Sequence, residues 1–84
     1  MNYRIEIKNK ARKFIGKQNP EQQKRILKAI YRIPNGDIKR LTGLNGLYRL
    51  RVGDYRIIYS MDNNKLVILI MNIGNRGDIY NSLQ

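Results

Sequence analysis

The sequence predicts an α+β domain in which two helices pack on one face of a single sheet. Apolar and charged residues alternate near the N-terminus, apolar residues recur at helical spacing over residues 9–33, and three strand-like runs follow. The order strand, helix, helix, then a three-stranded antiparallel meander is typical of helices gathered on one sheet face. Because 84 residues leave room for one hydrophobic core, we expect a single domain over residues 1–84.

The first strand and the first helix are separated by a change of period. Residues 3–7 alternate between apolar and charged side chains, which predicts a half-buried strand. From Asn9 onward, Ala11, Phe14 and Ile15 fall at positions i, i+3 and i+4. This spacing predicts a short amphipathic helix that ends near residues 16–18.

The second helix has a clear start and a clear stop. Asn19 can cap the helix, Pro20 suits its first position, and Glu21 places an acid in its first turn. An apolar stripe continues to Ile33, and Pro-Asn-Gly at 34–36 then ends the helix. Residues 9–33 are therefore expected to form a helical hairpin.

A connector over residues 37–46 is expected to lead into the meander. Its first two strands are Leu47–Val52 and Tyr55–Met61, joined by the two-residue turn Gly53–Asp54. The third strand, Leu66–Ile73, is apolar on both faces and should therefore lie inside the sheet. A turn at 74–78 and a short segment at 79–80 complete the expected fold.

The two-residue turn sets the register of the hairpin and places arginines together. Val52 then faces Tyr55, and Arg51 faces Arg56. Three arginines share one face, namely Arg49, Arg51 and Arg56. The tyrosines and aliphatic residues share the other face, which we expect to be core. Like charges directly opposite each other destabilise a sheet, so the cluster indicates a site for an external anion. The alternative is an ordinary solvated strand face.

Arg76 and Tyr80 are expected to approach this cluster. The last strand returns antiparallel, so its end lies beside the start of the strand that carries Arg56. Guanidinium groups match phosphate oxygens and keep their charge at physiological pH, and a phenol can stack on a base or transfer a proton. Packing of Tyr80 on the core as a C-terminal anchor is the alternative.

Composition restricts the chemistry further. The chain has no cysteine and no histidine, which excludes thiol and histidine catalysis and makes metal or cofactor sites unexpected. The formal charge of +11 favours a polyanionic partner, which could be RNA, DNA, an anionic membrane surface or an acidic protein. No apolar run is long enough to span a membrane and no signal peptide is visible, so we expect a cytoplasmic protein without membrane contact.

The residues from Ile38 to Tyr59 resemble a known family. The run IKRLTGLNGLYRLRVGDYRIIY and the ending IGNRGDIY are similar to the RelE/ParE superfamily of type II toxins, and the resemblance extends over essentially the whole chain. It implies a RelE-like, microbial-ribonuclease-like fold. In the RelE branch it implies a metal-independent endoribonuclease that cuts mRNA codons in the ribosomal A site and arrests translation. The ParE branch instead inhibits DNA gyrase, and a non-catalytic basic RNA-binding module is a third possibility.

The resemblance also assigns roles to individual residues. The implied catalytic set is Arg49, Arg51, Arg56, Arg76 and Tyr80. Asn75 stands where many relatives have histidine. The residues expected to grip RNA, or else to form a solubilising surface, are Lys10, Arg12, Lys13, Lys39 and Arg40. The implied partners are an acidic antitoxin and the ribosome, with its 16S-type rRNA and A-site mRNA. The toxin alone would be monomeric and would form a hetero-oligomer with the antitoxin.

Overall fold

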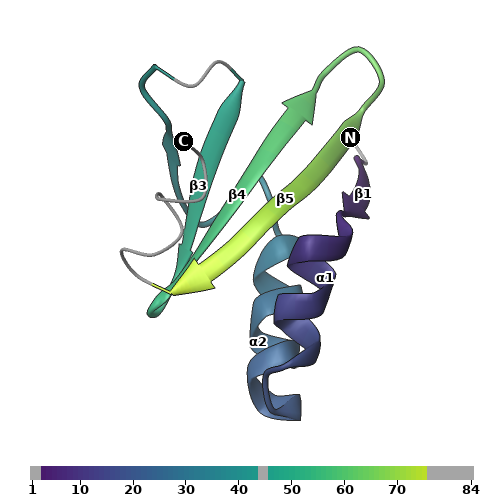
Figure 1. Cartoon of the computed structure of the whole chain (residues 1–84). Coiled ribbons are helices and arrows are strands. Elements are labelled where there is room, and N and C mark those ends of the chain that lie inside the picture. The colour runs from purple at the N-terminus through teal and green to yellow at the C-terminus, as the bar shows by residue number, and fades with distance from the viewer. Residues whose placement is uncertain (1–2, 44–45, 76–84) are drawn as a thin grey trace.

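The computed structural model describes residues 3–43 and 46–75, which form two helices and one five-stranded sheet (Figure 1). The elements follow one another as β1 (Arg4–Ile7), α1 (Asn9–Gly16), α2 (Pro20–Ile30), β2 (Asp37–Arg40), β3 (Leu47–Val52), β4 (Tyr55–Asp62) and β5 (Val67–Asn75). The predicted α+β architecture is confirmed. The two helices lie side by side on one face of the sheet (Figure 1). Within the described residues no helix covers the other face, which we call the open face.

The sheet is mixed, with strand order β1-β5-β4-β3-β2. β1 runs parallel to β5, and all other neighbours are antiparallel. β5 therefore lies between β1 and β4, as its two apolar faces predicted. A helical hairpin between β1 and the meander returns the chain to the far edge of the sheet, which allows the parallel pairing of the first and last strands.

The second helix begins where the sequence predicted and ends earlier. The Asn19 side chain accepts a hydrogen bond of 2.9 Å from the backbone N–H of Gln22, and Pro20 occupies the first turn. The helix ends at Ile30, and residues 31–34 form turns. The predicted helix, which extended to residue 33, was too long. Ile33 lies in a turn, but its side chain is buried in the core, so the apolar pattern continues beyond the end of the helix.

The expected connector over residues 37–46 was wrong in its first part. Asp37–Arg40 forms strand β2 and pairs antiparallel with β3, with Asp37 opposite Arg51 and Lys39 opposite Arg49. Four residues of which three are charged carry little strand signal of their own. The strand forms because β3 offers an unpaired edge, and the sequence pattern does not show that contact. Residues 44 and 45 of the expected connector lie outside the described residues.

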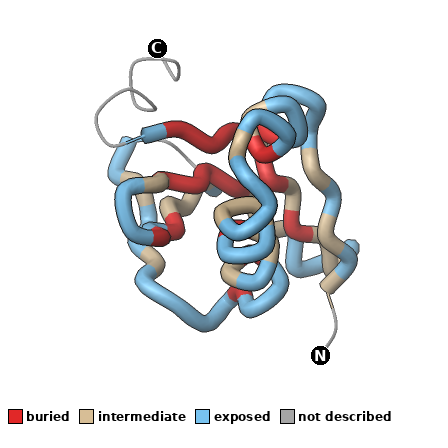
Figure 2. Tube along the Cα trace, turned by 90° about the horizontal axis from the view of Figure 1, so that it is seen from below, coloured by how far each residue is buried: buried red, intermediate tan, exposed pale blue. Residues whose placement is uncertain are grey.

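The hydrophobic core lies between the helices and the covered face of the sheet (Figure 2). Its fully buried side chains include Ile26, Ile57 and Ile70. A β-bulge between β4 and β5 shapes this core. Ile58 pairs with Asn72 whereas Tyr59 pairs with Ile70, so one extra residue of β5 stands between them. The bulge brings Ile73 to the same face as Ile70, and both belong to the core.

Within residues 3–43 and 46–75, neither helix has the length or the apolar character needed to cross a bilayer.

Candidate functional site

The β3–β4 hairpin has the register that its sequence predicted. Val52 pairs with Tyr55 and Arg51 with Arg56, so the turn consists of Gly53 and Asp54. Leu50 and Val52 belong to the core beneath the helices. Because side chains alternate along a strand, Arg49, Arg51 and Arg56 lie on the opposite, open face of the sheet. We call these three residues the arginine cluster.

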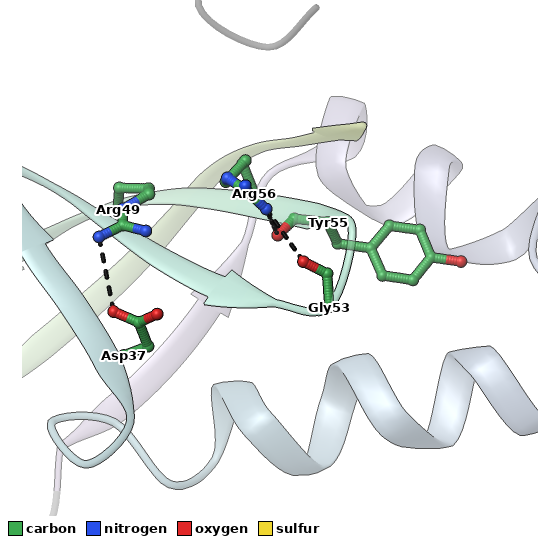
Figure 3. Close-up of polar contacts among 5 residues, drawn as sticks. All are labelled: Asp37, Arg49, Gly53, Tyr55 and Arg56. Atoms are coloured by element: carbon green, nitrogen blue, oxygen red, sulfur yellow. Dashed lines mark hydrogen bonds and ion pairs between the residues drawn. The ribbon is translucent and has the colours of Figure 1, made fainter. Parts of the chain in front are cut away.

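The three arginines differ in how tightly they are held, and Figure 3 shows two of them, Arg49 and Arg56. Arg51 is exposed. The Arg49 side chain is 13% exposed, and its Nη2 lies 3.6 Å from Oδ1 of Asp37 on β2. The acid comes from outside the hairpin, because residue 37 lies in β2 and not in the connector that the sequence predicted.

Arg56 is buried, with 8% of its surface exposed, although it faces the open side of the sheet. Its Nη1 donates hydrogen bonds to the carbonyl oxygens of Gly53, at 3.0 Å, and of Tyr55, at 3.1 Å (Figure 3). The two carbonyl contacts place positive charge next to the turn and hold the guanidinium in a defined position. They also explain how Arg56 tolerates a position directly opposite Arg51.

Helix α2 supports the same turn from the other side. Gly53 has φ of +59°, a conformation in which glycine is favoured. A Cβ atom added there would lie 2.8 Å from Nη2 of Arg25, so this guanidinium packs directly against the Gly53 backbone. Arg25 is one of several basic residues of α2. A helical basic residue carries no sequence signal that distinguishes packing on a distant turn from exposure to solvent.

The tyrosines of the hairpin belong to the core. Tyr48 and Tyr59 stack with ring centroids 5.4 Å apart, and Tyr55 meets Phe14 edge to face at 5.8 Å. The Tyr55 hydroxyl donates a 3.1 Å hydrogen bond to Oε1 of Gln18, and its ring points away from Arg56 (Figure 3). Burial, together with the neighbouring Tyr48 phenol, raises the pKa of Tyr59 to about 12. Tyr55 therefore ties the hairpin to the helices, whereas Tyr48 and Tyr59 pack on each other within the hairpin.

The five residues predicted to grip RNA fall in different places. Lys39 pairs with Arg49 and so joins the open face, whereas Arg40 pairs with Tyr48 and belongs to the covered face. Lys10 and Lys13 line a surface depression of about 260 Å³ between α1 and the end of β5. In α1, Arg12 donates a 3.5 Å hydrogen bond from Nη2 to a backbone carbonyl of β1.

The two remaining predicted site residues, Arg76 and Tyr80, lie outside the described residues. The strand that leads to them ends beside the cluster, since Gly74 pairs with Arg56 and Asn75 with Tyr55. Within the described ranges, no three acidic, histidine or cysteine side chains gather as a metal site would require.

Comparison with known proteins identifies relatives of the whole chain. Residues 8–80 match the family model described as the ParE toxin of the type II toxin–antitoxin system parDE. Toxin RelG of Mycobacterium tuberculosis is 29% identical over 89 residues, which cover 95% of this chain and 98% of that protein.

Two solved structures have a similar fold. The archaeal RelE–RelB complex from Pyrococcus horikoshii is matched with a TM-score of 0.77 and 31% identity, over 93% of this chain and 99% of that one. The RelB–RelE antitoxin–toxin complex from Methanococcus jannaschii is matched with a TM-score of 0.72 and 23% identity, over 94% and 99% of the two chains.

Proposed function

This chain belongs to the ParE toxin family of type II toxin–antitoxin systems, and we propose that it arrests translation by cutting mRNA on the ribosome. One observation carries the proposal. Two arginines of adjacent strands stand directly opposite each other on the open sheet face, and the acid that approaches the cluster pairs with a third. This surface carries excess positive charge where a folding requirement alone would favour neutral or opposite charges.

The reaction would use the RNA's own 2′-hydroxyl. That oxygen attacks the adjacent phosphorus, the bond from phosphorus to the 5′-oxygen of the next nucleotide breaks, and the leaving oxygen takes up a proton. Charge develops on the phosphate oxygens in the transition state, and preorganised cations lower its energy. Arg51 is free to contact those oxygens, and Arg49 adds positive potential beside it. Arg56 is held in place by its carbonyl contacts.

Arg76 and Tyr80 would complete the catalytic set, with Arg76 binding phosphate and Tyr80 orienting a base or assisting proton transfer. The strand pairing at Gly74 and Asn75 leads the chain toward Arg56, which supports this part of the proposal. Because the chain has no histidine, we expect slow cleavage of free RNA and efficient cleavage only where ribosomal RNA and the A-site codon complete the geometry.

We also propose an acidic antitoxin as the resting partner. The net charge of +11 favours association with an acidic protein, and a solved archaeal relative is a RelE–RelB complex. An antitoxin that covers the arginine cluster would prevent access of RNA to it. The chain alone is expected to be monomeric and the neutralised form a hetero-oligomer, both in the cytoplasm.

The proposal is tested in a cell-free translation extract. Purified toxin should produce mRNA cuts that map to the A-site codon by primer extension. Arg51→Gln should reduce the rate of these cuts about 100-fold, the usual effect of removing one electrostatic contact to a transition state. Arg4→Gln is the matched control, because Arg4 is an exposed arginine on the opposite edge strand. Intact mRNA in an arrested extract would contradict the proposal.

Inhibition of DNA gyrase is the second candidate, and the family model that matches the chain is that of a ParE toxin. It predicts an early loss of DNA synthesis with translation initially unchanged. Pulse labelling of protein and DNA synthesis after induction separates the two candidates. A non-catalytic RNA-binding module would cause neither effect.

A further inference from the structure

The two carbonyl groups that hold Arg56 on the open face belong to residues that are themselves held by the helical layer. Nη1 of Arg56 donates to the carbonyl oxygen of Gly53 at 3.0 Å and to that of Tyr55 at 3.1 Å. Gly53 lies against a side chain of α2, and Tyr55 contacts α1 and the loop after it. The backbone of the β3–β4 turn therefore connects the helices to a buried guanidinium of the arginine cluster.

The guanidinium of Arg25 packs against Gly53 from the side of α2. A Cβ atom added to Gly53 would lie 2.8 Å from Nη2 of Arg25 and 3.1 Å from both Cζ and Nη1. Because these three atoms of one planar group are almost equally distant, the group turns its flat face toward Gly53. Arg25 thus fills the space that a side chain at residue 53 would take, and it limits the movement of Gly53 toward α2.

Helix α2 gives Arg25 a fixed base. The next residue, Ile26, is fully buried in the core, and so is Ile30 one turn later. Arg25 itself is exposed, and within residues 3–43 and 46–75 it forms no ion pair. Its packing on the turn is therefore the contact that sets the position of its guanidinium.

Tyr55, the second residue whose carbonyl binds Arg56, has a support of its own. Its ring meets Phe14 edge to face with centroids 5.8 Å apart, and its hydroxyl donates a 3.1 Å hydrogen bond to Oε1 of Gln18. Gln18 is fixed in turn, since its Nε2 donates to the carbonyl oxygen of Phe14 at 3.1 Å. Figure 3 shows the Tyr55 ring directed away from Arg56 while the Tyr55 carbonyl faces it. Of the two carbonyls, that of Gly53 is the one that depends on Arg25.

The position of Arg56 matters because it stands directly opposite the exposed Arg51 in the strand register. Like charges in this arrangement repel each other, so the two carbonyl acceptors are needed to keep the Arg56 guanidinium beside its neighbour. A cation that is already fixed needs no reorganisation when charge develops on a phosphate in the transition state. A loosened Arg56 would lose this advantage.

We propose that Arg25 is a positioning residue for Arg56. It fixes the Gly53 carbonyl from the helical side of the turn and thereby holds the Arg56 guanidinium in place beside Arg51. The consequence for catalysis rests on the proposed RNA-cutting function, whereas the coupling between Arg25 and Arg56 is independent of it. The inference assigns a role in the site to a residue of α2, which packs on the other face of the sheet.

Rotation of the Arg56 guanidinium tests this coupling. In ¹⁵N-labelled protein, NMR resolves Nη1 from Nη2 while rotation about the Nε–Cζ bond is slow, and loss of these signals in Arg56→Gln assigns them. Arg25→Gln should accelerate the rotation about tenfold, as the weakening of one hydrogen bond predicts. Lys24→Gln is the matched control, because it removes the same charge from the adjacent exposed position, and its rotation rate should stay within about twofold. An unchanged rate in Arg25→Gln, or equal acceleration in both variants, would overturn the proposal.

The rate of mRNA cleavage tests the consequence. In the translation extract, Arg25→Gln should lower kcat for A-site cuts about tenfold and leave KM within about twofold, because Arg25 orients a group that acts in the transition state and does not contact RNA itself. Lys24→Gln should change neither constant. A raised KM with unchanged kcat would indicate a contact with RNA and would overturn the positioning role.

Failure of this inference and failure of the proposed function give different results. If Arg25→Gln accelerates the rotation but the wild-type chain makes no A-site cuts, the coupling of Arg25 to Arg56 stands and the cleavage function is rejected. If the wild-type chain makes A-site cuts and Arg25→Gln leaves kcat unchanged, the positioning role is rejected and the cleavage function stands.

Discussion

Strand β3 presents two different surfaces on alternate residues. On the covered side, Leu50 and Val52 are buried in a core of aliphatic and aromatic groups. On the open side, Arg49 and Arg51 face solvent or the acid of the neighbouring strand. The covered side is held by burial of apolar area, whereas the open side gathers like charges that oppose association of the strands. The comparison indicates that one face of the hairpin stabilises the fold and the other is free to carry function.

The largest effect on stability should come from the covered face. Ile57 is fully buried in the core, so Ile57→Ala removes buried methylene groups and leaves a cavity. We expect the free energy of unfolding to fall by about 2–5 kcal/mol. Urea denaturation followed by circular dichroism measures this change. A loss below about 1 kcal/mol would show that the core does not depend on the covered face of β4.

Arg56 lies on the open face and should nevertheless contribute to the stability of the fold. It lies on the open side and yet is buried with hydrogen bonds to Gly53 and Tyr55. Arg56→Gln should therefore lower the free energy of unfolding by about 1–3 kcal/mol, because charge-assisted bonds to two carbonyls are lost. Arg51→Gln is the matched comparison and should change it by less than about 0.5 kcal/mol. Equal stability of the two variants would show that the hydrogen bonds of Arg56 do not stabilise the fold.

The free energy of unfolding should depend on pH through Tyr59, which is buried on the covered face. Burial raises the pKa of Tyr59 from its ordinary value of 10.0 to about 12. Between these two pH values the unfolded chain loses the phenol proton while the folded chain retains it. Stability is therefore fully present below pH 10 and declines as pH rises toward 12, by up to about 2 kcal/mol. In parallel denaturation series, Tyr59→Phe should show a flatter decline. Identical slopes would mean that Tyr59 does not contribute.

The smallest effect should follow removal of the acid at the open face. Asp37→Asn eliminates the ion pair with Arg49, and a half-exposed pair of this kind contributes less than about 1 kcal/mol. The same change removes a negative charge beside the arginine cluster, so the affinity for a short oligonucleotide should rise. Fluorescence anisotropy measures this affinity. A reduced affinity would indicate that Asp37 contacts the ligand directly.

The elements with strong local signals could be predicted from the sequence. Asn19, Pro20 and Glu21 marked the start of α2, and the Gly53–Asp54 turn set the register of the hairpin, so the shared face of the arginines followed from the period of two. Strand β2 could not be predicted, because its four residues gain strand structure by pairing with β3.

For the candidate site, the sequence could predict which residues share a face, but not how each one is held. The contact of Arg25 with Gly53, the carbonyl bonds of Arg56 and the ion pair from Asp37 join segments far apart in the chain or depend on side-chain conformation. None of these contacts leaves a periodic pattern in the sequence.

By itself, the sequence determined the α+β class, the order of the elements, the hairpin register and the gathering of arginines on one face, because these follow from local spacing and turn chemistry. Only the tertiary structure decided that an acid from β2 reaches Arg49, that Arg56 is buried, and that Arg25 packs against Gly53. The physical reason is that these features arise between elements, where distance and burial control the interaction and sequence separation does not.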